Sequence, residues 1–336
     1  MQLHDLENLL LSKGSQQHLL HQKADAIKRQ SVGKNIYNRA LIEVSNICHK
    51  NCYYCGIRKN TDLLRYQLSK ELVVDLALNA YENGFRSLVL QSGEIQSSPF
   101  THYIASILKE IAIRTRQNMH VTLSCGEQTR QTLQEWKQSG AHRYLLRIET
   151  SNIGLYHKIH PCDQLHAFEQ RLETLKHLKE LNYQVGSGIL IGFPFQTIKD
   201  LAKDILFLKS LDLDMIGLGP YIEHPDTPLW NHPSILFSKP ERLDLTLNTI
   251  SLLRILCCDI NIASATALEV MAPHGRSAAL SAGANVFMTN LTPDMIKSQY
   301  DLYPGKNSMA LNTPNFFFCI NDWGDSLHYL KRNNQI

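Results

Sequence analysis

From about residue 40 onward, short apolar runs alternate with longer stretches in which apolar residues recur every three or four positions. The short runs predict buried strands and the longer stretches predict helices that cover them. Eight runs are predicted as strands, at 41–44, 87–91, 121–124, 144–148, 185–190, 215–219, 260–264 and 285–289. Because strands that alternate with helices form parallel sheets, eight such units predict an α/β fold, a TIM-type (βα)8 barrel.

Two of the predicted helices carry capping signals. Ser69 precedes an amphipathic stretch that Gly84 can end. Thr197 is followed three residues later by Asp200, which is the spacing of a capping box. Helices are therefore expected to start at these two points.

The rest of the chain divides around the predicted barrel. Residues 1–35 have a helical pattern of their own, and we expect this N-terminal extension to pack as a lid or plug before the first strand. Residues 36–310 form the predicted barrel, and 311–336 form a shorter tail packed on it. Neither an internal repeat nor a low-complexity linker interrupts the sequence, so a single domain is expected.

Distinctive polar residues follow the first four predicted strands. A cysteine loop follows the first, 92–94 the second and 125–127 the third, while 147–150 ends the fourth. The loops after the strands of a (βα)8 barrel gather at one mouth, where chemistry is found. The sequence therefore predicts one functional rim.

Cys48, Cys52 and Cys55 form a CxxxCxxC motif after the first strand. Three thiolates can hold three irons of a [4Fe-4S] cube and leave the fourth iron open. An open iron can chelate S-adenosylmethionine (SAM), and one electron passed to its sulfonium gives a 5′-deoxyadenosyl radical. Zinc stays an alternative because His49 lies within the loop. The other cysteines, Cys125, Cys162, Cys257, Cys258 and Cys319, have no partner at metal-site spacing and are interpreted as small hydrophobic residues.

Candidate SAM contacts lie beside this loop. Tyr54 is placed to contact the adenine, and Ser92-Gly93-Glu94 offers acceptors for the methionine amino group. The alternative for 92–94 is a plain turn. Glu149 is a candidate for the ribose hydroxyls or the ammonium of SAM.

Charged residues near strand ends indicate a small anionic substrate. Arg147 and Glu149 alternate along a strand and so point the same way, which is costly inside a barrel unless they are paired with each other or bind ligand. Arg171 is a candidate for the SAM carboxylate. The arginines that suggest the anionic substrate are Arg39, Arg143, Arg147 and Arg171, and the residues expected to line the lumen farther from the cluster are Met215, Thr266, Met288 and Tyr303. Surface charges and core packing are the alternatives for these sets.

Composition narrows the functional class. The chain is 43% hydrophobic and 19% charged, which is typical of a soluble enzyme, and its net charge of +3 is too small to indicate a nucleic-acid partner. No apolar run approaches the ~20 residues of a membrane span, and the start at Met1 resembles no signal peptide. These features predict a cytoplasmic enzyme, without a membrane partner.

Several longer motifs resemble the HydE family, the radical SAM maturases of [FeFe]-hydrogenase. They occur in the family's order over residues 20–306, at 48–60, 88–94, 122–127, 143–150, 217–229, 282–286 and 302–306. The resemblance implies a [4Fe-4S] cluster, SAM and a role in building the diiron subcluster. The adenosyl radical would attack the sulfur of a cysteine-bound Fe(CO)2(CN) complex delivered by HydG, with HydF and an electron donor as further partners.

The resemblance also implies residue roles. Arg147, Glu149 and Arg171 would hold SAM, and Thr122 would face the active site. The carboxylate ligands would be Arg39 and Arg143, and the substrate cavity would be lined by Met215, Thr266 and Tyr303. With Arg147 and Glu149, Thr122 and Tyr303 are the candidate catalytic residues.

Three positions depart from the family pattern. Ile148 stands where a histidine is common, Ala265 where a threonine is usual, and Phe195 where a glycine is usual. The exchange at Ile148 is expected to alter hydrogen bonding in the lumen. The alternatives are a HydE-like or PylB-like enzyme for another small sulfur or amino-acid substrate, a scaffold that passes on an iron complex without turnover, and a metal-binding structural protein. A second, C-terminal cluster is not expected, because only Cys319 is available there.

Overall fold

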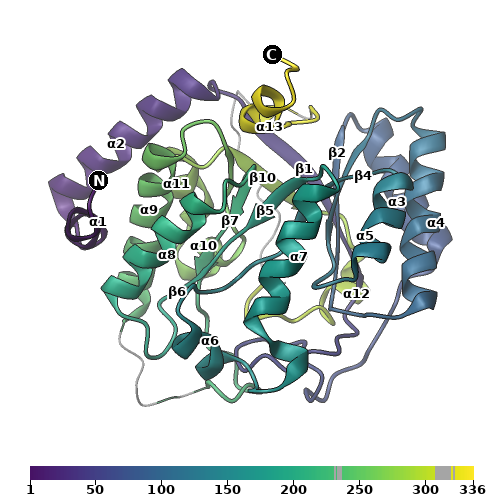
Figure 1. Cartoon of the computed structure of the whole chain (residues 1–336), viewed down its shortest axis with the longest axis horizontal. Helices are drawn as coiled ribbons and strands as arrows, with labels where there is room; N and C mark the ends of the chain where they lie inside the picture. Colours follow the sequence, from purple (N-terminus) through teal and green to yellow (C-terminus); the bar gives the residue numbers. More distant parts are fainter. Residues whose placement is uncertain (231, 233–236, 307–318, 321) are drawn as a thin grey trace.

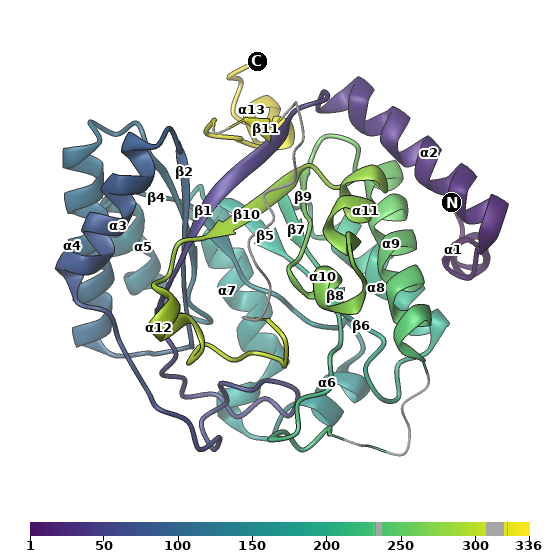
Figure 2. The same cartoon turned by 180° about the vertical axis from the view of Figure 1, so that it is seen from behind.

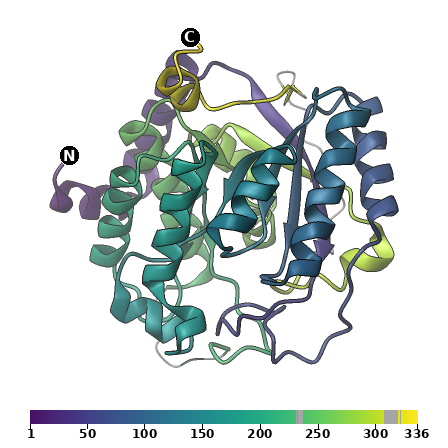
Figure 3. The same ribbon diagram turned by 45° about the vertical axis from the view of Figure 1, so that its right-hand side comes forward.

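The computed structural model describes residues 1–230, 232, 237–306, 319–320 and 322–336. Within these residues, eight parallel strands close into a barrel in the order β1, β2, β3, β4, β5, β7, β9, β10, with β10 pairing back to β1. The barrel strands are β1 (Ile36–Ser45), β2 (Ser87–Ser92), β3 (His120–Ser124), β4 (Ala141–Leu145), β5 (Gln184–Ser187), β7 (Met215–Gly217), β9 (Asn261–Ala263) and β10 (Val286–Asn290). The predicted (βα)8 barrel is confirmed, and Figures 1 to 3 show its helices on the outside.

Every predicted strand overlaps a barrel strand, but several are shorter than predicted. Residues 190–191 and 219–220 separate from the barrel as β6 (Leu190–Ile191) and β8 (Gly219–Pro220), a parallel pair of their own. The fourth strand ends at Leu145, although the backbone N–H groups of Leu146 and Ile148 still donate to Gly186 O and Gly188 O at 3.0 Å. The rim residues 147–149 are thus held by hydrogen bonds beyond the regular strand.

The two predicted capped helix starts are confirmed. Ser69 accepts a hydrogen bond from Leu72 N, and Thr197 and Asp200 form a reciprocal capping box. The helices that follow the strands are α3 (Lys70–Glu82), α4 (Ser98–Arg114), α5 (Arg130–Gln138), α6 (Ile153–Ile159), α7 (Phe168–Glu180), α8 (Ile198–Ser210), α9 (Lys239–Leu256), α10 (Ala267–Met271), α11 (Gly275–Ser281) and α12 (Asp294–Lys297). No helix among the described residues is long and apolar enough to cross a bilayer.

The N-terminal helices cover the flank of the barrel. Helix α1 (Leu3–Leu10) packs against α8 and α9, and α2 (Gly14–Ser31) packs along α9 (Figures 1 and 2). Asn248 of α9 fixes the end of α1 by donating hydrogen bonds to the backbone oxygens of Leu10 and Ser12 at 2.9 and 3.0 Å. The expectation of a lid or plug is therefore wrong, because the apolar faces of α1 and α2 pack against outer helices of the barrel.

The C-terminal tail lies at the amino ends of the barrel strands. Strand β11 (Cys319–Ile320) pairs with the start of β1, and α13 (Leu327–Arg332) follows it. Ser326 N donates to Gln184 Oε1 at 3.1 Å, at the first residue of β5. The predicted boundary at residue 310 and part of the tail lie outside the described residues, so the division of the chain stays a prediction.

Candidate active site

The cysteine loop at the carboxyl ends of the strands is fixed from several sides. His49 N donates to Glu94 O at 2.8 Å, and Asn51 N donates to His166 Nε2 at 2.8 Å. After the motif, Gly56 N donates to Leu302 O at 3.1 Å. Gly56 must be glycine, since a Cβ atom there would lie 2.0 Å from Asp301 O. The loop is thus shaped by three chain segments that are distant in sequence.

The three motif thiols suit a cluster. Cys52 is buried, Cys48 and Cys55 are half-buried, and burial together with the Cys48 charge raises the pKa of Cys55 to about 12. These thiols thus lie close enough to disfavour each other's ionisation, which bound iron would reverse. A single ion needs its ligands to meet at one point, and among the described residues no three His, Cys, Asp or Glu side chains do so. A cube, which gives each thiolate its own iron, does not require this.

A buried ion cluster lies beneath the loop. Lys50, between the first two cysteines, has its Nζ 3.2 Å from Glu94 Oε1 and 3.0 Å from Glu127 Oε2. Arg171 Nε donates to Glu127 Oε1 at 2.7 Å and its Nη1 to Arg147 O at 2.9 Å. Burial and the nearby Glu127 carboxylate raise the pKa of Glu94 to about 7, against the lowering effect of Lys50 and Arg171. Lys50 and Glu127 were not predicted as partners, although a lysine inside a cysteine loop is a usable signal.

Four candidate SAM contacts lie at this ion cluster or against the cysteine loop. The Glu94 and Arg171 side chains are paired within the ion cluster, and neither lines the cavity described below. Gly93 packs against the loop, because a Cβ atom there would lie 2.2 Å from Ile47 O. Ser92 Oγ donates to Gly93 O at 2.6 Å. The structure thus places 92–94 and Arg171 behind the loop, where they support it.

A cavity of about 670 Å³ fills the barrel lumen below the loop. Tyr54 and Cys55 lie on its wall together with Glu149 and its neighbour Arg147. The other predicted site residues on the wall are Arg39, Thr122, Met215, Thr266, Met288 and Tyr303. Thr266 Oγ1 and Tyr303 Oη are 2.6 Å apart, and the buried Thr122 Oγ1 has no partner among the described residues. The structure therefore brings most of the predicted rim and lumen residues together around one space.

Glu149 is held in an unusual backbone conformation. Its φ is +67°, in the left-handed region that favours glycine, and its backbone N–H and C=O are bound to Gly188 O and Leu190 N at 3.1 and 3.0 Å. Arg147 Nη2 lies 2.9 Å from Glu149 Oε2 but donates to Ile189 O at 2.8 Å. The ion pair considered from sequence is present, and Oε2 still accepts no well-directed hydrogen bond among the described residues.

Arg143 lies away from this cavity. Its fully buried guanidinium donates to Ser87 Oγ at 3.2 Å and to Trp323 O and Asp325 Oδ1 of the tail, at the amino end of the barrel. Arg39 lies between the two regions, lining the cavity while donating to Gly324 O at 3.0 Å. The guanidinium of Arg143, which was expected to bind a carboxylate of the substrate, is thus hydrogen-bonded to the C-terminal tail.

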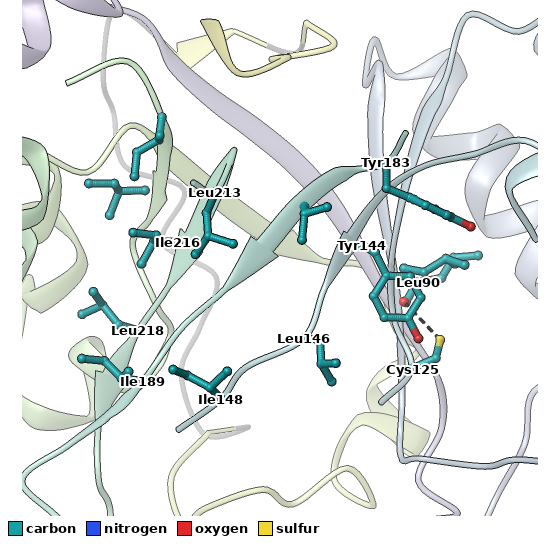
Figure 4. Close-up of a cluster of buried hydrophobic side chains, with 14 of the residues drawn as sticks. Leu90, Cys125, Tyr144, Leu146, Ile148, Tyr183, Ile189, Leu213, Ile216 and Leu218 are labelled. Atoms are coloured by element: carbon teal, nitrogen blue, oxygen red, sulfur yellow. Dashed lines mark hydrogen bonds between the residues drawn. The ribbon is translucent and has the colours of Figure 1, made fainter. Parts of the chain in front are cut away.

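Ile148 points outward into the core between the barrel and its helices. Leu145, Arg147 and Glu149 line the cavity, so the intervening Leu146 and Ile148 face the other side. Figure 4 shows Ile148 among aliphatic side chains, and it is fully buried. The expected effect of Ile148 on lumen hydrogen bonding is therefore wrong.

Ile148→His tests this placement. We expect it to lower the free energy of unfolding by about 2 kcal/mol, because a polar ring would enter an aliphatic core. SAM cleavage at a temperature where the protein stays folded is expected to be unchanged. Thermal unfolding and 5′-deoxyadenosine release measure the two effects, with Ile148→Val as a matched variant costing about 1 kcal/mol. Altered cleavage in a fully stable Ile148→His protein would contradict the placement.

The other two departures, Phe195 and Ala265, lie in different surroundings. Phe195 has φ +75°, so the family's glycine suits the position, and in this chain its ring packs 4.6 Å from the His232 ring and 4.5 Å from Lys158 Nζ. Ala265 lies on the cavity wall. Of the three departures, Ala265 is the one that reaches the lumen.

Comparison with known proteins decides the family. Residues 42–208 match the model of the radical SAM superfamily. The [FeFe] hydrogenase maturase subunit HydE of Thermotoga maritima is 46% identical over 290 residues, covering 85% of this chain and 79% of that protein. The chain belongs to the HydE family. As a HydE-family radical SAM enzyme, it cleaves SAM to a 5′-deoxyadenosyl radical, and the scaffold without turnover and the structural metal protein are set aside.

Other matches are more distant. The 3-methylornithine synthase of Methanosarcina acetivorans is 26% identical over 85% of this chain and 78% of that protein. The crystal structure of methylornithine synthase (PylB) superposes with a TM-score of 0.74 at 23% identity, covering 85% of this chain and 82% of that one. The maturase HydG from Carboxydothermus hydrogenoformans superposes with a TM-score of 0.70 at 20% identity, covering 86% and 67%. These structures support the barrel fold alone.

Proposed function

We propose that this HydE-family enzyme acts in assembly of the [FeFe]-hydrogenase diiron subcluster. Its adenosyl radical attacks the sulfur of a cysteine-bound Fe(CO)2(CN) complex, a small anionic substrate supplied by HydG. The observation that carries the proposal is the lumen cavity, on whose wall Cys55, Glu149, Thr122 and Tyr303 lie together in a chain 46% identical to a maturase.

The residues present suit the cofactors that the family implies. Cys48, Cys52 and Cys55 would hold three irons of a [4Fe-4S] cluster, whose open iron would bind SAM and supply the cleaving electron. Tyr54 and Glu149, on the adjoining wall, would contact SAM, and Arg147 would orient Glu149 from 2.9 Å. A supporting role would fall to Arg171, Glu94 and the backbone of 92–93. Their contacts hold the cysteine loop in place, so they would position the cluster and SAM without contacting SAM directly.

The cavity wall is suited to an anionic substrate. Its positive side chains are Arg39, Arg147, Arg276, Lys297 and Lys306, and its carboxylates are Glu43, Glu149 and Glu269. Arg39 would bind an anionic part of the substrate from the floor, with Met215, whose sulfur lies 3.3 Å from Arg39 Nη1. Thr266 and Tyr303, which also line the cavity, would contact the substrate as a hydrogen-bonded pair.

Glu149→Gln is expected to lower SAM cleavage by about 10- to 100-fold. A charge-assisted hydrogen bond contributes roughly 1.5 to 3 kcal/mol, and glutamine keeps the shape of the side chain while losing its charge. Release of 5′-deoxyadenosine by the reduced enzyme measures the effect. Glu169→Gln, on the exposed start of α7, is a matched control. Cleavage at the unchanged rate in Glu149→Gln would remove Glu149 from the SAM site.

The maturase role is tested by complementation. The anaerobically reconstituted enzyme is added to HydG, HydF, SAM, an electron donor and reductant in a mixture that lacks HydE, and hydrogen evolution is assayed. Evolution that depends on Cys48, Cys52 and Cys55 is expected. If the protein cleaves SAM but gives no hydrogenase, the substrate is a different one. The alternative is then a PylB-like reaction on another small sulfur or amino-acid compound, which the match to 3-methylornithine synthase favours.

A further inference from the structure

A carboxylate with no assigned role lies on the cavity wall. Glu43 belongs to β1, where Arg39, Leu41 and Glu43 alternate along the strand and line the cavity together. Its side chain is fully buried, and Oε1 pairs with Lys306 Nζ. Its other oxygen, Oε2, has no hydrogen-bond partner among the described residues. Half of a buried carboxylate on the cavity wall is thus left for a ligand.

The surrounding structure holds this pair in place. Glu43 N donates to Thr292 Oγ1 at 2.8 Å, and Tyr66 Oη donates to Glu43 O at 3.0 Å. Lys306 has a 7% exposed side chain, and its Nζ lies 4.9 Å from the Tyr300 ring centroid. The loop that carries Lys306 also accepts the hydrogen bond from Gly56, directly after the last cluster cysteine. The pair is therefore fixed on the side of the cavity nearest the cysteine loop.

The spacing of the charges restricts what can bind. Arg39 lies four residues before Glu43, so the two side chains start about 13 Å apart along the strand. The ammonium and carboxylate of an α-amino acid are separated by one Cα atom and lie about 3 Å apart. Arg39 is directed away from Glu43, because its guanidinium donates to Gly324 O at the amino end of the barrel, whereas Glu43 is paired with Lys306 near the cysteine loop. One amino acid head group therefore does not contact both. It does match two adjacent side chains of opposite charge.

We propose that Glu43 and Lys306 bind the α-amino acid head group of the substrate. Glu43 accepts hydrogen bonds from the ammonium, and Lys306 donates to the carboxylate. This inference rests on the proposed function, in which the substrate is built on cysteine. The sulfur end is then directed into the lumen, and Arg39 on the floor is left for the anionic remainder of the substrate. The head group is bound by the mouth-side pair and not by Arg39 and Arg143.

Three small probes test the assignment on the cluster-loaded enzyme with SAM bound. They are L-cysteine, 3-mercaptopropionate, which lacks the ammonium, and L-cysteine methyl ester, which lacks the carboxylate charge. Anaerobic titration calorimetry gives each Kd. The wild type is expected to bind L-cysteine at least about 10-fold more tightly than either analogue, the range of one charged hydrogen bond.

The variants separate the two contacts. Glu43→Gln is expected to raise the Kd of L-cysteine about 10- to 100-fold and to leave the Kd of 3-mercaptopropionate within about threefold of the wild-type value. Lys306→Met is expected to raise the Kd of L-cysteine by the same factor and to leave that of L-cysteine methyl ester within about threefold. Glu269→Gln is the matched control. Glu269 lines the same cavity but accepts from the backbone N–H groups of His274 and Arg276, at 2.9 and 3.1 Å. Its probe selectivity should equal that of the wild type.

Two results would overturn the assignment. One is a wild type that prefers L-cysteine to neither analogue. The other is a Glu43→Gln protein that binds all three probes more weakly by the same factor, which would mean that the pair stabilises the fold and does not contact the ligand. If a single variant fails to fold, Glu43→Gln with Lys306→Met leaves no lone buried charge and should lose selectivity among the probes. Selective binding by an enzyme that fails in hydrogenase maturation would overturn the maturase role and not this site.

Discussion

Replacement of Cys52 by alanine is expected to abolish reductive SAM cleavage. Cys52 is the buried member of the motif, and the pKa of its thiol is raised well above its usual value by burial and by the nearby Cys55 and Cys48. Without it, two thiolates remain, and they cannot hold three irons of a cube. Iron content, visible absorption of the cluster and 5′-deoxyadenosine release should all fall to background.

The matched control is Cys258→Ala, the same exchange at an exposed cysteine after α9. It should keep wild-type iron content and cleavage, because a surface thiol contributes little to stability. The Cys52→Ala protein should still fold, since its loop is also held by the Lys50 ion cluster and by Asn51 N on His166. Full iron loading of Cys52→Ala would show that Cys52 is not a ligand.

The barrel could be predicted because its signals are local. Each strand is a short apolar run flanked by an amphipathic helix, and capping pairs such as Thr197 with Asp200 lie within one turn. The cysteine spacing is equally local. The rim followed from topology, because the carboxyl ends of parallel strands always meet at one mouth.

The side-chain partners could not be predicted in this way. Strand β1 is buried at nearly every residue, so its pattern does not show that Glu43 faces the lumen. Its partner Lys306 is 263 residues away in sequence. For Ile148 the signal was present, because inward-facing Arg147 and Glu149 place the residue between them on the outer face.

Arg143 shows the same difficulty at the other end of the barrel. The inward direction of its side chain could be predicted, but its partner comes from the tail, 182 residues later. The Asp325 carboxylate also accepts from Gln184 Nε2 at 2.7 Å and lies 3.2 Å from His120 Nδ1. Burial alone would raise the pKa of Asp325, but the His120 hydrogen bond and the Arg143 charge hold this pKa well below its usual range.

Asp325→Asn is therefore expected to lower the free energy of unfolding by about 3 to 5 kcal/mol, because it leaves the fully buried Arg143 without a counter-charge. Urea unfolding at pH 7 measures this loss. Asp322→Asn, at an exposed neighbouring position, should stay within about 0.5 kcal/mol of the wild type. Adding Arg143→Met to Asp325→Asn should recover most of the stability.

The pH dependence of the same pair gives an independent check. Because the folded-state pKa of Asp325 is depressed, its contribution is present above the unfolded value near 3.9 and is lost as the pH falls toward the folded value. The difference in unfolding free energy between wild type and Asp325→Asn should therefore be constant from pH 7 to about 5 and shrink below about pH 4. A constant difference at all pH values would mean that shape, and not charge, makes Asp325 necessary.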